Sequence, residues 1–326
     1  MAQMNLIDGV KAAIRDEMRR DASIVVLGED VGVRGGVFRA TEGLIEEFGE
    51  GRVIDAPLSE SSIVGVGIGM ALHGLRPIAE IQFADFILPA VNQIISEAAK
   101  MRYRSHNDWH VPMVIRAPFG GGVHGALYHS QSNEALFMTP GLKVVIPSNP
   151  ADANGLLRSA IRDEDPVVFY EHKRLYRLVK GDVPEGENLV PIGRAKVTRE
   201  GSDLTIIAYG LMHHLALEAA EALAADGVSA EVVDLRTLMP LDRETVLQSI
   251  AKTHRALVVY EANRTLGPGA EVAATIAEEA LFELDAPIVR VTGPDIPAMP
   301  YNQVQEDLFM PNSEKIVAGA HRLLAS

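Results

Sequence analysis

The chain contains no cysteine among its 326 residues, which excludes disulfides, thiolate metal ligands and cysteine nucleophiles. Basic side chains are also in deficit, since 30 Lys and Arg stand against 44 Asp and Glu, for a formal net charge of −14. This acidic excess leaves no strong basic face to neutralise phosphates, and it argues against nucleic-acid binding.

Long apolar runs are missing as well. The longest, around residues 63–75, is interrupted by glycines and is too short to cross a bilayer. Residues 1–5 carry no basic-then-apolar targeting signal. We therefore expect a protein of the bacterial cytoplasm that does not enter membranes, and a processed mitochondrial matrix protein would have the same features.

Three common catalytic signatures are absent: the phosphate-binding P-loop, the H-E-x-x-H zinc helix and the G-x-S-x-G nucleophile elbow. Gly65 and Gly67 resemble the start of a dinucleotide fingerprint, but Met70 stands where its third glycine belongs. These glycines also fall inside a predicted helix rather than in the turn before it. A nicotinamide-dependent oxidoreductase is therefore disfavoured, and we interpret the glycines as allowing close helix packing against another subunit.

The chain does have an alternation of strand and helix patterns, in a composition that is 47% hydrophobic. This alternation predicts an α/β fold with a largely parallel sheet. Periodicity is lost over residues 180–191, where glycine, proline and acidic residues indicate a linker. We predict a first domain over residues 1–185, a linker over 186–192 and a smaller α/β domain over 193–326. Asp242 and Ser313 are predicted helix N-caps of the second domain.

The stretch from Asp55 to Gly74 is the most informative part of the sequence. A short strand is predicted over residues 52–55, and a helix follows over 62–72 with so few polar groups that we expect it to be buried. Glu60 lies between them, where desolvation would raise its proton affinity. On spacing alone, an acid that merely complements the helix dipole is the simpler interpretation.

Several motifs occur in a fixed order along the chain. They are Leu58-Ser-Glu60, Ile78-Ala-Glu-Ile-Gln-Phe-Ala-Asp-Phe86, Gly120-Gly-Gly-Val-His124, His129-Ser-Gln-Ser132, Val233-Asp-Leu-Arg-Thr-Leu-Met-Pro240 and Arg290-Val-Thr-Gly-Pro-Asp295. Together they resemble the beta subunit of the thiamin diphosphate-dependent 2-oxoacid dehydrogenases, the family of the pyruvate and branched-chain enzymes. The resemblance covers nearly the whole chain. It implies a transketolase-like pyrimidine-binding domain with a parallel sheet, followed by a smaller transketolase-type C-terminal domain.

The resemblance also implies roles for particular residues. Glu60 would be the carboxylic acid that is hydrogen-bonded to the aminopyrimidine ring of thiamin diphosphate. Phe86 would pack against that ring, without the hydroxyl of the tyrosine that some relatives carry there, and Gln82 and Leu58 would line the same pocket. Glu29, which follows the predicted strand 23–28, would have a minor part in the site; an exposed strand-end acid is the alternative.

His129 follows a glycine-rich loop that begins at Gly120. In the related subunits a histidine here handles protons at the substrate channel, and an imidazole titrates near working pH. From the residues alone, a structural histidine or a metal site shared with His124 are alternatives. No carboxylate lies at a recognisable metal-site spacing, which disfavours the metal.

One element of the thiamin diphosphate enzymes is missing, the Gly-Asp-Gly motif that holds the diphosphate through Mg²⁺. The resemblance therefore implies an alpha subunit that supplies the Mg²⁺ site, in a heterotetramer of two alpha and two beta chains that is active only when assembled. Its reaction would be oxidative decarboxylation of a 2-oxoacid with reductive acylation of lipoyl groups on a dihydrolipoyl acyltransferase core.

The preferred substrate is predicted from two segments. Residues 124–132 and 293–301 resemble the branched-chain type more than the pyruvate type, so branched-chain 2-oxoacids are predicted, with pyruvate or acetoin as the alternative. A non-catalytic transketolase-like binding subunit is a remoter alternative, and such a subunit would be expected to lack Glu60.

A structural K⁺ site is a further expectation from the resemblance. It would combine an acidic turn with backbone carbonyls from a neighbouring strand, and a solvated acidic turn is an equal alternative. The residues expected to form it are Val111, Met113, Val114, Ala160, Asp163 and Asp165.

Overall fold

The computed structural model describes residues 1–326, and its internal contacts divide the chain into two compact units. The first comprises Met1–Phe119 and Leu136–Ile192, and the second comprises Gly120–Ala135 and Gly193–Ser326. Residues 120–135 are predicted to belong to the first domain, whereas in the structure they group with the second unit. The reason is that Glu261 and Glu306 accept hydrogen bonds from the backbone of this segment.

The first unit is built on a parallel sheet whose strands lie in the order β6-β7-β5-β4-β2-β3. Residues of β2, β5 and β7 are buried throughout, as expected of strands covered on both faces. In the register, Gly28 is opposite both Asp55 of β3 and Glu80 of β4. The strands are β2 (Ile24–Gly28), β3 (Val53–Asp55), β4 (Arg76–Glu80), β5 (Val114–Phe119), β6 (Lys143–Val145) and β7 (Val167–His172). A separate antiparallel pair joins β1 (Ala2–Asn5) to β8 (Lys180–Val183).

Helices cover this sheet by their apolar faces. Ile7, Val10, Ile14 and Met18 form an apolar stripe that is buried on α1, whose N-cap Asn5 accepts a hydrogen bond from the Asp8 backbone. α1 packs against α5, and α3 packs against β4. The helices of this unit are α1 (Leu6–Arg20), α2 (Leu44–Phe48), α3 (Glu60–Leu72), α4 (Ala99–Arg104), α5 (Pro150–Arg162) and α6 (Leu175–Leu178).

The segment before α4 is less regular than an α-helix. It begins as a 3₁₀-helix, η1 (Ala84–Ala90), and continues as a π-helix, η2 (Asn92–Ala98). Pro89 lies inside η1, where its missing N–H prevents a regular hydrogen-bond ladder. Only residues 81–83 separate β4 from this segment, and this places Phe86 near the end of that strand.

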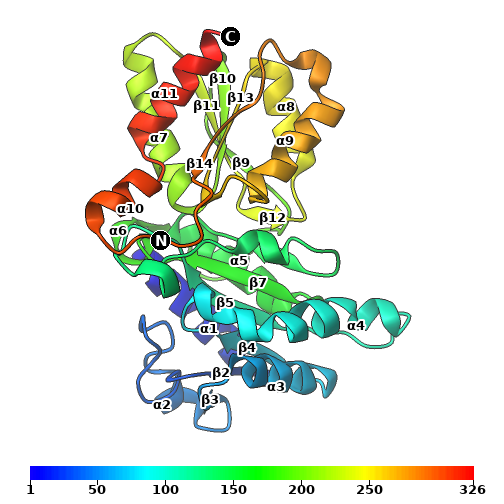
Figure 1. Cartoon of the computed structure of the whole chain (residues 1–326). Helices are drawn as coiled ribbons and strands as arrows, with labels where there is room; N and C mark the ends of the chain where they lie inside the picture. The colour runs from blue at the N-terminus through cyan, green and yellow to red at the C-terminus, as the bar shows by residue number, and fades with distance from the viewer. The chain divides into compact units, whose positions relative to one another are not determined.

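The second unit is a smaller α/β layer structure with the strand order β14-β13-β10-β11-β9, in which only β9 is antiparallel to its neighbour. Helices α7 and α11 cover one face of the sheet, and α8 and α9 cover the other (Figure 1). The strands are β9 (Lys196–Arg199), β10 (Leu204–Ala208), β11 (Ala230–Asp234), β12 (Thr237–Met239), β13 (Ala256–Asn263) and β14 (Val289–Gly293). The helices are η3 (Ala126–Tyr128), η4 (Glu134–Phe137), α7 (Gly210–Ala225), α8 (Arg243–Thr253), α9 (Pro268–Glu279), η5 (Leu281–Glu283), α10 (Gln303–Phe309) and α11 (Ser313–Leu324). None of the helices is both long and apolar enough to cross a membrane.

Candidate active site

The residues predicted to bind a cofactor in the first unit lie at one edge of its sheet. β2, β3 and β4 are adjacent parallel strands, so their carboxyl ends share an edge, the usual place for ligands in α/β folds. Glu29 directly follows β2, Glu60 follows β3, and Phe86 follows β4. The structure thus gathers at one edge residues that are up to 57 positions apart, from Glu29 to Phe86, and Leu58 and Gln82 lie on the same connections.

Hydrogen bonds fix the connection after β2 against the connection after β3. The Gly32 N–H donates to Asp55 Oδ1 (2.6 Å), and the Ala56 N–H donates to the Gly28 carbonyl (2.8 Å). The Gly32 backbone approaches Asp55 so closely that a Cβ there would lie 2.5 Å from Oδ2. The segment that carries Glu29 is therefore held beside the segment that leads to Glu60.

Glu60 is the first residue of α3, and it is half-buried in this single chain rather than buried as predicted. The physical reason is that α3 covers β4 with one face only. Ile63, Val64 and Ile68 are buried, whereas Val66 is 52% exposed on the opposite face. The prediction that this apolar helix is buried all round is therefore wrong for the isolated chain.

Glu29 and Glu60 form an interacting pair of acids. Burial raises the pKa of the Glu29 carboxyl, and the negative charges of Asp30 and Glu60 raise it further. The carboxyl groups at this edge can form hydrogen bonds with a bound group.

Aromatic side chains lie on the connections that follow β2 and β4 at the same edge of the sheet. Phe86 packs edge-on against Phe83 with ring centroids 5.6 Å apart, and Phe83 meets Phe38 in the same way at 5.5 Å. Leu58 is 72% exposed, and Gln82 is half-buried. Two acids, an aromatic ring and an exposed leucine together suit a flat heteroaromatic ring with nitrogen atoms at its rim, as in an aminopyrimidine.

A buried ionic network, which was not predicted from the sequence, links neighbouring strands at the same end of the sheet. Arg116 of β5 donates to Glu80 (Nη1 to Oε2, 2.5 Å) and, through Nε and Nη2, to both oxygens of Glu171 (2.6 and 2.7 Å). The Tyr176 hydroxyl donates to Glu171 (2.7 Å). Burial raises the pKa of Glu80. The sequence signal for this network was Glu80, a charged residue in a buried strand, because a buried charge needs a partner.

His129 belongs to the second unit. It follows η3 in the segment Gly120–Ala135 and is exposed. The structure therefore groups His129 with the second unit, and Glu60 and Phe86 with the first. Glu261 and Glu306, which hold this segment, were not identified from the sequence, because they lie 129 or more positions further along the chain.

The acidic turn expected to hold K⁺ already has cationic partners. The Lys143 ammonium donates to both carboxylate oxygens of Asp163 (2.6 Å each), and Arg102 donates to Asp165 (2.9 Å). Of the carbonyl groups expected to bind K⁺, those of Val111, Met113 and Ala160 already accept hydrogen bonds from backbone N–H groups. Val114 lies in β5. No group of three or more His, Cys, Asp or Glu residues is placed to hold a metal ion.

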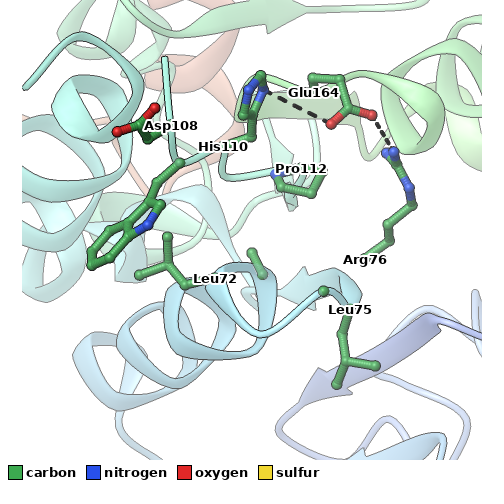
Figure 2. Close-up of a pocket in the computed structure, with 10 residues that line it drawn as sticks. Leu72, Leu75, Arg76, Asp108, His110, Pro112 and Glu164 are labelled. Atoms are coloured by element: carbon green, nitrogen blue, oxygen red, sulfur yellow. Dashed lines mark hydrogen bonds and ion pairs between the residues drawn. The ribbon is translucent and has the colours of Figure 1, made fainter. Parts of the chain in front are cut away.

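A hollow of about 270 Å³ in the first unit contains none of the predicted site residues. In Figure 2, Arg76 and His110 both point toward Glu164, while Leu72 lines the opposite side. Arg76 begins β4, and Pro112 precedes β5, so the hollow lies at the amino ends of the strands. Ligands of parallel sheets bind at the carboxyl ends, which makes the Glu29–Glu60 edge the better candidate.

A parallel sheet with acids and aromatic residues at its carboxyl edge, followed by a second α/β unit, is the arrangement of a transketolase-type chain. The sequence matches the pyrimidine binding domain of transketolase over residues 2–179 and the transketolase C-terminal domain over residues 193–316. A solved structure of a split gene transketolase, an inactive beta4 tetramer, superposes with a TM-score of 0.80 over 99% of this chain and 98% of the other. At 24% identity, that likeness shows the fold alone.

Curated relatives narrow the family. The 2-oxoisovalerate dehydrogenase subunit beta of Bacillus subtilis is 60% identical over 99% of both chains. The pyruvate dehydrogenase E1 component subunit beta of the same organism is 51% identical over 99% of both chains. The chain belongs to the family of 2-oxoacid dehydrogenase beta subunits, as its ordered motifs indicated.

Proposed function

We propose that this chain is the beta half of a lipoyl-transferring 2-oxoacid dehydrogenase that acts on branched-chain 2-oxoacids, of the 3-methyl-2-oxobutanoate type. The observation that carries the proposal is the Glu29–Glu60 pair beside Phe86 at the carboxyl edge of β2, β3 and β4. The higher identity to a 2-oxoisovalerate dehydrogenase beta subunit, 60% against 51% for a pyruvate dehydrogenase one, supports the choice of substrate. Pyruvate or acetoin is the alternative substrate.

Thiamin diphosphate, when bound, supplies the electron sink that lets a 2-oxoacid lose CO₂. Glu60 would hold a proton at its carboxyl group and share it with a ring nitrogen of the aminopyrimidine. Glu29 would have a minor part in the site, as an acid whose own pKa is raised by burial and by the nearby charges of Asp30 and Glu60. Phe86 would pack against the ring, Gln82 and Leu58 would line the same pocket, and His129 would move protons during decarboxylation or acyl transfer.

The proposal includes partners. An alpha subunit would supply the Mg²⁺ and diphosphate half of the site in a heterotetramer of two alpha and two beta chains, which would reside in the cytoplasm. The exposed apolar residues Leu58 and Val66, which flank Glu60 in the sequence, support a subunit that is completed by another chain. A lipoyl-bearing dihydrolipoyl acyltransferase core would receive the acyl group. For the acidic turn at Asp163, the Lys143 contact favours an internal cation over K⁺.

Co-expression of this chain with an alpha subunit, in the presence of thiamin diphosphate and Mg²⁺, tests the proposal. Reduction of an artificial electron acceptor is measured with 3-methyl-2-oxobutanoate and with pyruvate. Faster turnover of the branched acid is expected. A preference for pyruvate would retain the mechanism and overturn the substrate, and failure to form an active complex would favour the non-catalytic binding subunit.

The role of Glu60 is tested in the same complex by Glu60→Gln. An amide cannot share a proton with the ring, so the decarboxylation rate should fall by about 10²-fold or more while the complex still assembles. Glu46→Gln, on the exposed surface of α2, is the matched control and should retain full activity. Full activity of Glu60→Gln would contradict the catalytic assignment.

A further inference from the structure

The loop that carries His129 has an unfavourable backbone conformation. His124 and Ala126 have φ values of +56° and +59°, in the left-handed region that non-glycine residues rarely adopt. Gly120 and Gly122 have positive φ as well, at +93° and +75°. Such conformations persist only where surrounding contacts hold them in place. The contacts of this loop therefore decide whether it keeps its shape.

Glu306 makes three of those contacts. It lies on α10 and is fully buried. Its Oε1 accepts a hydrogen bond from the Gly122 N–H (2.8 Å), and its Oε2 accepts one from the His124 N–H (3.2 Å). Nδ1 of His124 lies 2.6 Å from the same Oε2. One carboxylate thus binds the backbone on both sides of residue 123 and the side chain of the strained His124.

A second carboxylate closes the loop at its ends. Glu261 of β13 accepts hydrogen bonds from the Gly121 N–H (3.0 Å) and from the hydroxyl of Ser132. The side chains of Met299 and Met310, which lie on either side of α10, approach Gly121 so closely that a Cβ there would lie 2.6 and 2.7 Å from them. The loop is thus fixed at both ends by Glu261 and in its middle by Glu306.

We propose that Glu306 is a positioning residue, which holds the loop of residues 120–132 in the conformation that presents His129. The inference rests on the proposed role of His129 in the reaction. It assigns Glu306 no contact with substrate. The contact of Nδ1 with Glu306 also holds the imidazole ring of His124 in one orientation.

Amide hydrogen exchange of the assembled alpha–beta complex, followed by mass spectrometry, tests this directly. Glu306→Gln retains one acceptor oxygen but turns a donor NH₂ group toward one of the loop's own donors. Peptides covering residues 120–132 should then exchange on the order of tenfold faster, and kcat should fall about 10- to 100-fold through misplacement of His129. Glu314→Gln, on the exposed side of α11, is the control and should change neither. Unchanged exchange in Glu306→Gln would overturn the proposal.

Substitutions of His124 separate positioning from chemistry. Asparagine tolerates a left-handed φ and carries a donor where Nδ1 stands, so His124→Asn should preserve both loop protection and activity. Alanine offers neither property, and His124→Ala should resemble Glu306→Gln. Loss of activity in His124→Asn with intact loop protection would overturn positioning in favour of proton transfer by His124 itself. Should His129→Ala retain activity, the proposed role of His129 fails, whereas the exchange rates still decide the role of Glu306.

Discussion

Replacing Arg116 by methionine should strongly destabilise the first unit. Arg116 is fully buried and holds two carboxylates, Glu80 and Glu171, that are 3% and 0% exposed. Burial acts to lower the pKa of Arg116, but the charges of Glu171 and Glu80 outweigh it, so the guanidinium stays charged. Methionine fills most of the volume and supplies no charge. Two buried acids would then lack their cation.

The expected loss follows from the burial of the network. Removing one partner of a buried ion pair costs about 3–5 kcal/mol, because an uncompensated charge remains behind. The Tyr176 hydroxyl would still bind Glu171, whereas Glu80 would lose its Arg116 hydrogen bond, so we expect a value of about 4 kcal/mol. Domains have about 5–15 kcal/mol of stability in total, so this loss is a large part of it. Because 1 kcal/mol shifts the melting temperature of a unit this size by about 2–4 °C, the melting temperature should fall by roughly 10 °C.

Urea unfolding followed by tryptophan fluorescence is the assay. Trp109 is the single tryptophan of the chain and lies in the first unit, so its signal reports on that unit. Arg177→Met, at an exposed position of α6, is the control and should stay within about 0.5 kcal/mol of the parent. Adding Glu80→Gln to Arg116→Met should recover part of the loss, because it removes one orphaned charge. A loss below about 1 kcal/mol in Arg116→Met, or no recovery in the double variant, would refute the reasoning.

Three further predictions concern other parts of the chain. Burial raises the pKa of Glu134 to about 7 from its ordinary 4.5, so about 3 kcal/mol of stability should be present below pH 4.5 and be lost as the pH rises through 7. Calorimetry from pH 4 to 8 should show this loss of stability with rising pH in the parent and not in Glu134→Gln. The same pH dependence in both proteins would contradict the assignment. Gly141→Ala should lower the free energy of unfolding by about 3 kcal/mol, because φ is +92° and a Cβ would overlap the Ala99 carbonyl. Gly51→Ala is the control and should be neutral, because a Cβ there would have no atom within 4 Å. Urea unfolding measures both variants, and equal losses would disprove the prediction. Exchanging K⁺ for tetramethylammonium should leave the melting temperature unchanged, because the Lys143 ammonium already neutralises Asp163. A drop of more than about 2 °C would support the K⁺ site instead.

Local patterns of the sequence were enough to predict the elements and the family. The strands predicted over residues 23–28 and 52–55 are present as β2 and β3, because hydrophobic spacing is a local property of the chain. Asp242 was correctly predicted as an N-cap, whereas the cap of α11 is Asn312 rather than Ser313, a shift of one residue that local preference does not resolve. The ordered motifs were enough to indicate a 2-oxoacid dehydrogenase beta subunit, because each motif is a contiguous run of residues whose identity does not depend on folding.

Tertiary structure decided which groups meet. Periodicity predicts strands but not which strands are neighbours. Periodicity alone therefore did not show that Glu29, Glu60 and Phe86 follow three adjacent strands. The partners of buried charges lie far apart in the chain, 36 and 55 positions for Arg116 and 184 positions for Gly122 and Glu306. Local spacing does not encode pairs at such separations, because they form only when the chain folds and desolvation forces each buried charge to find a partner.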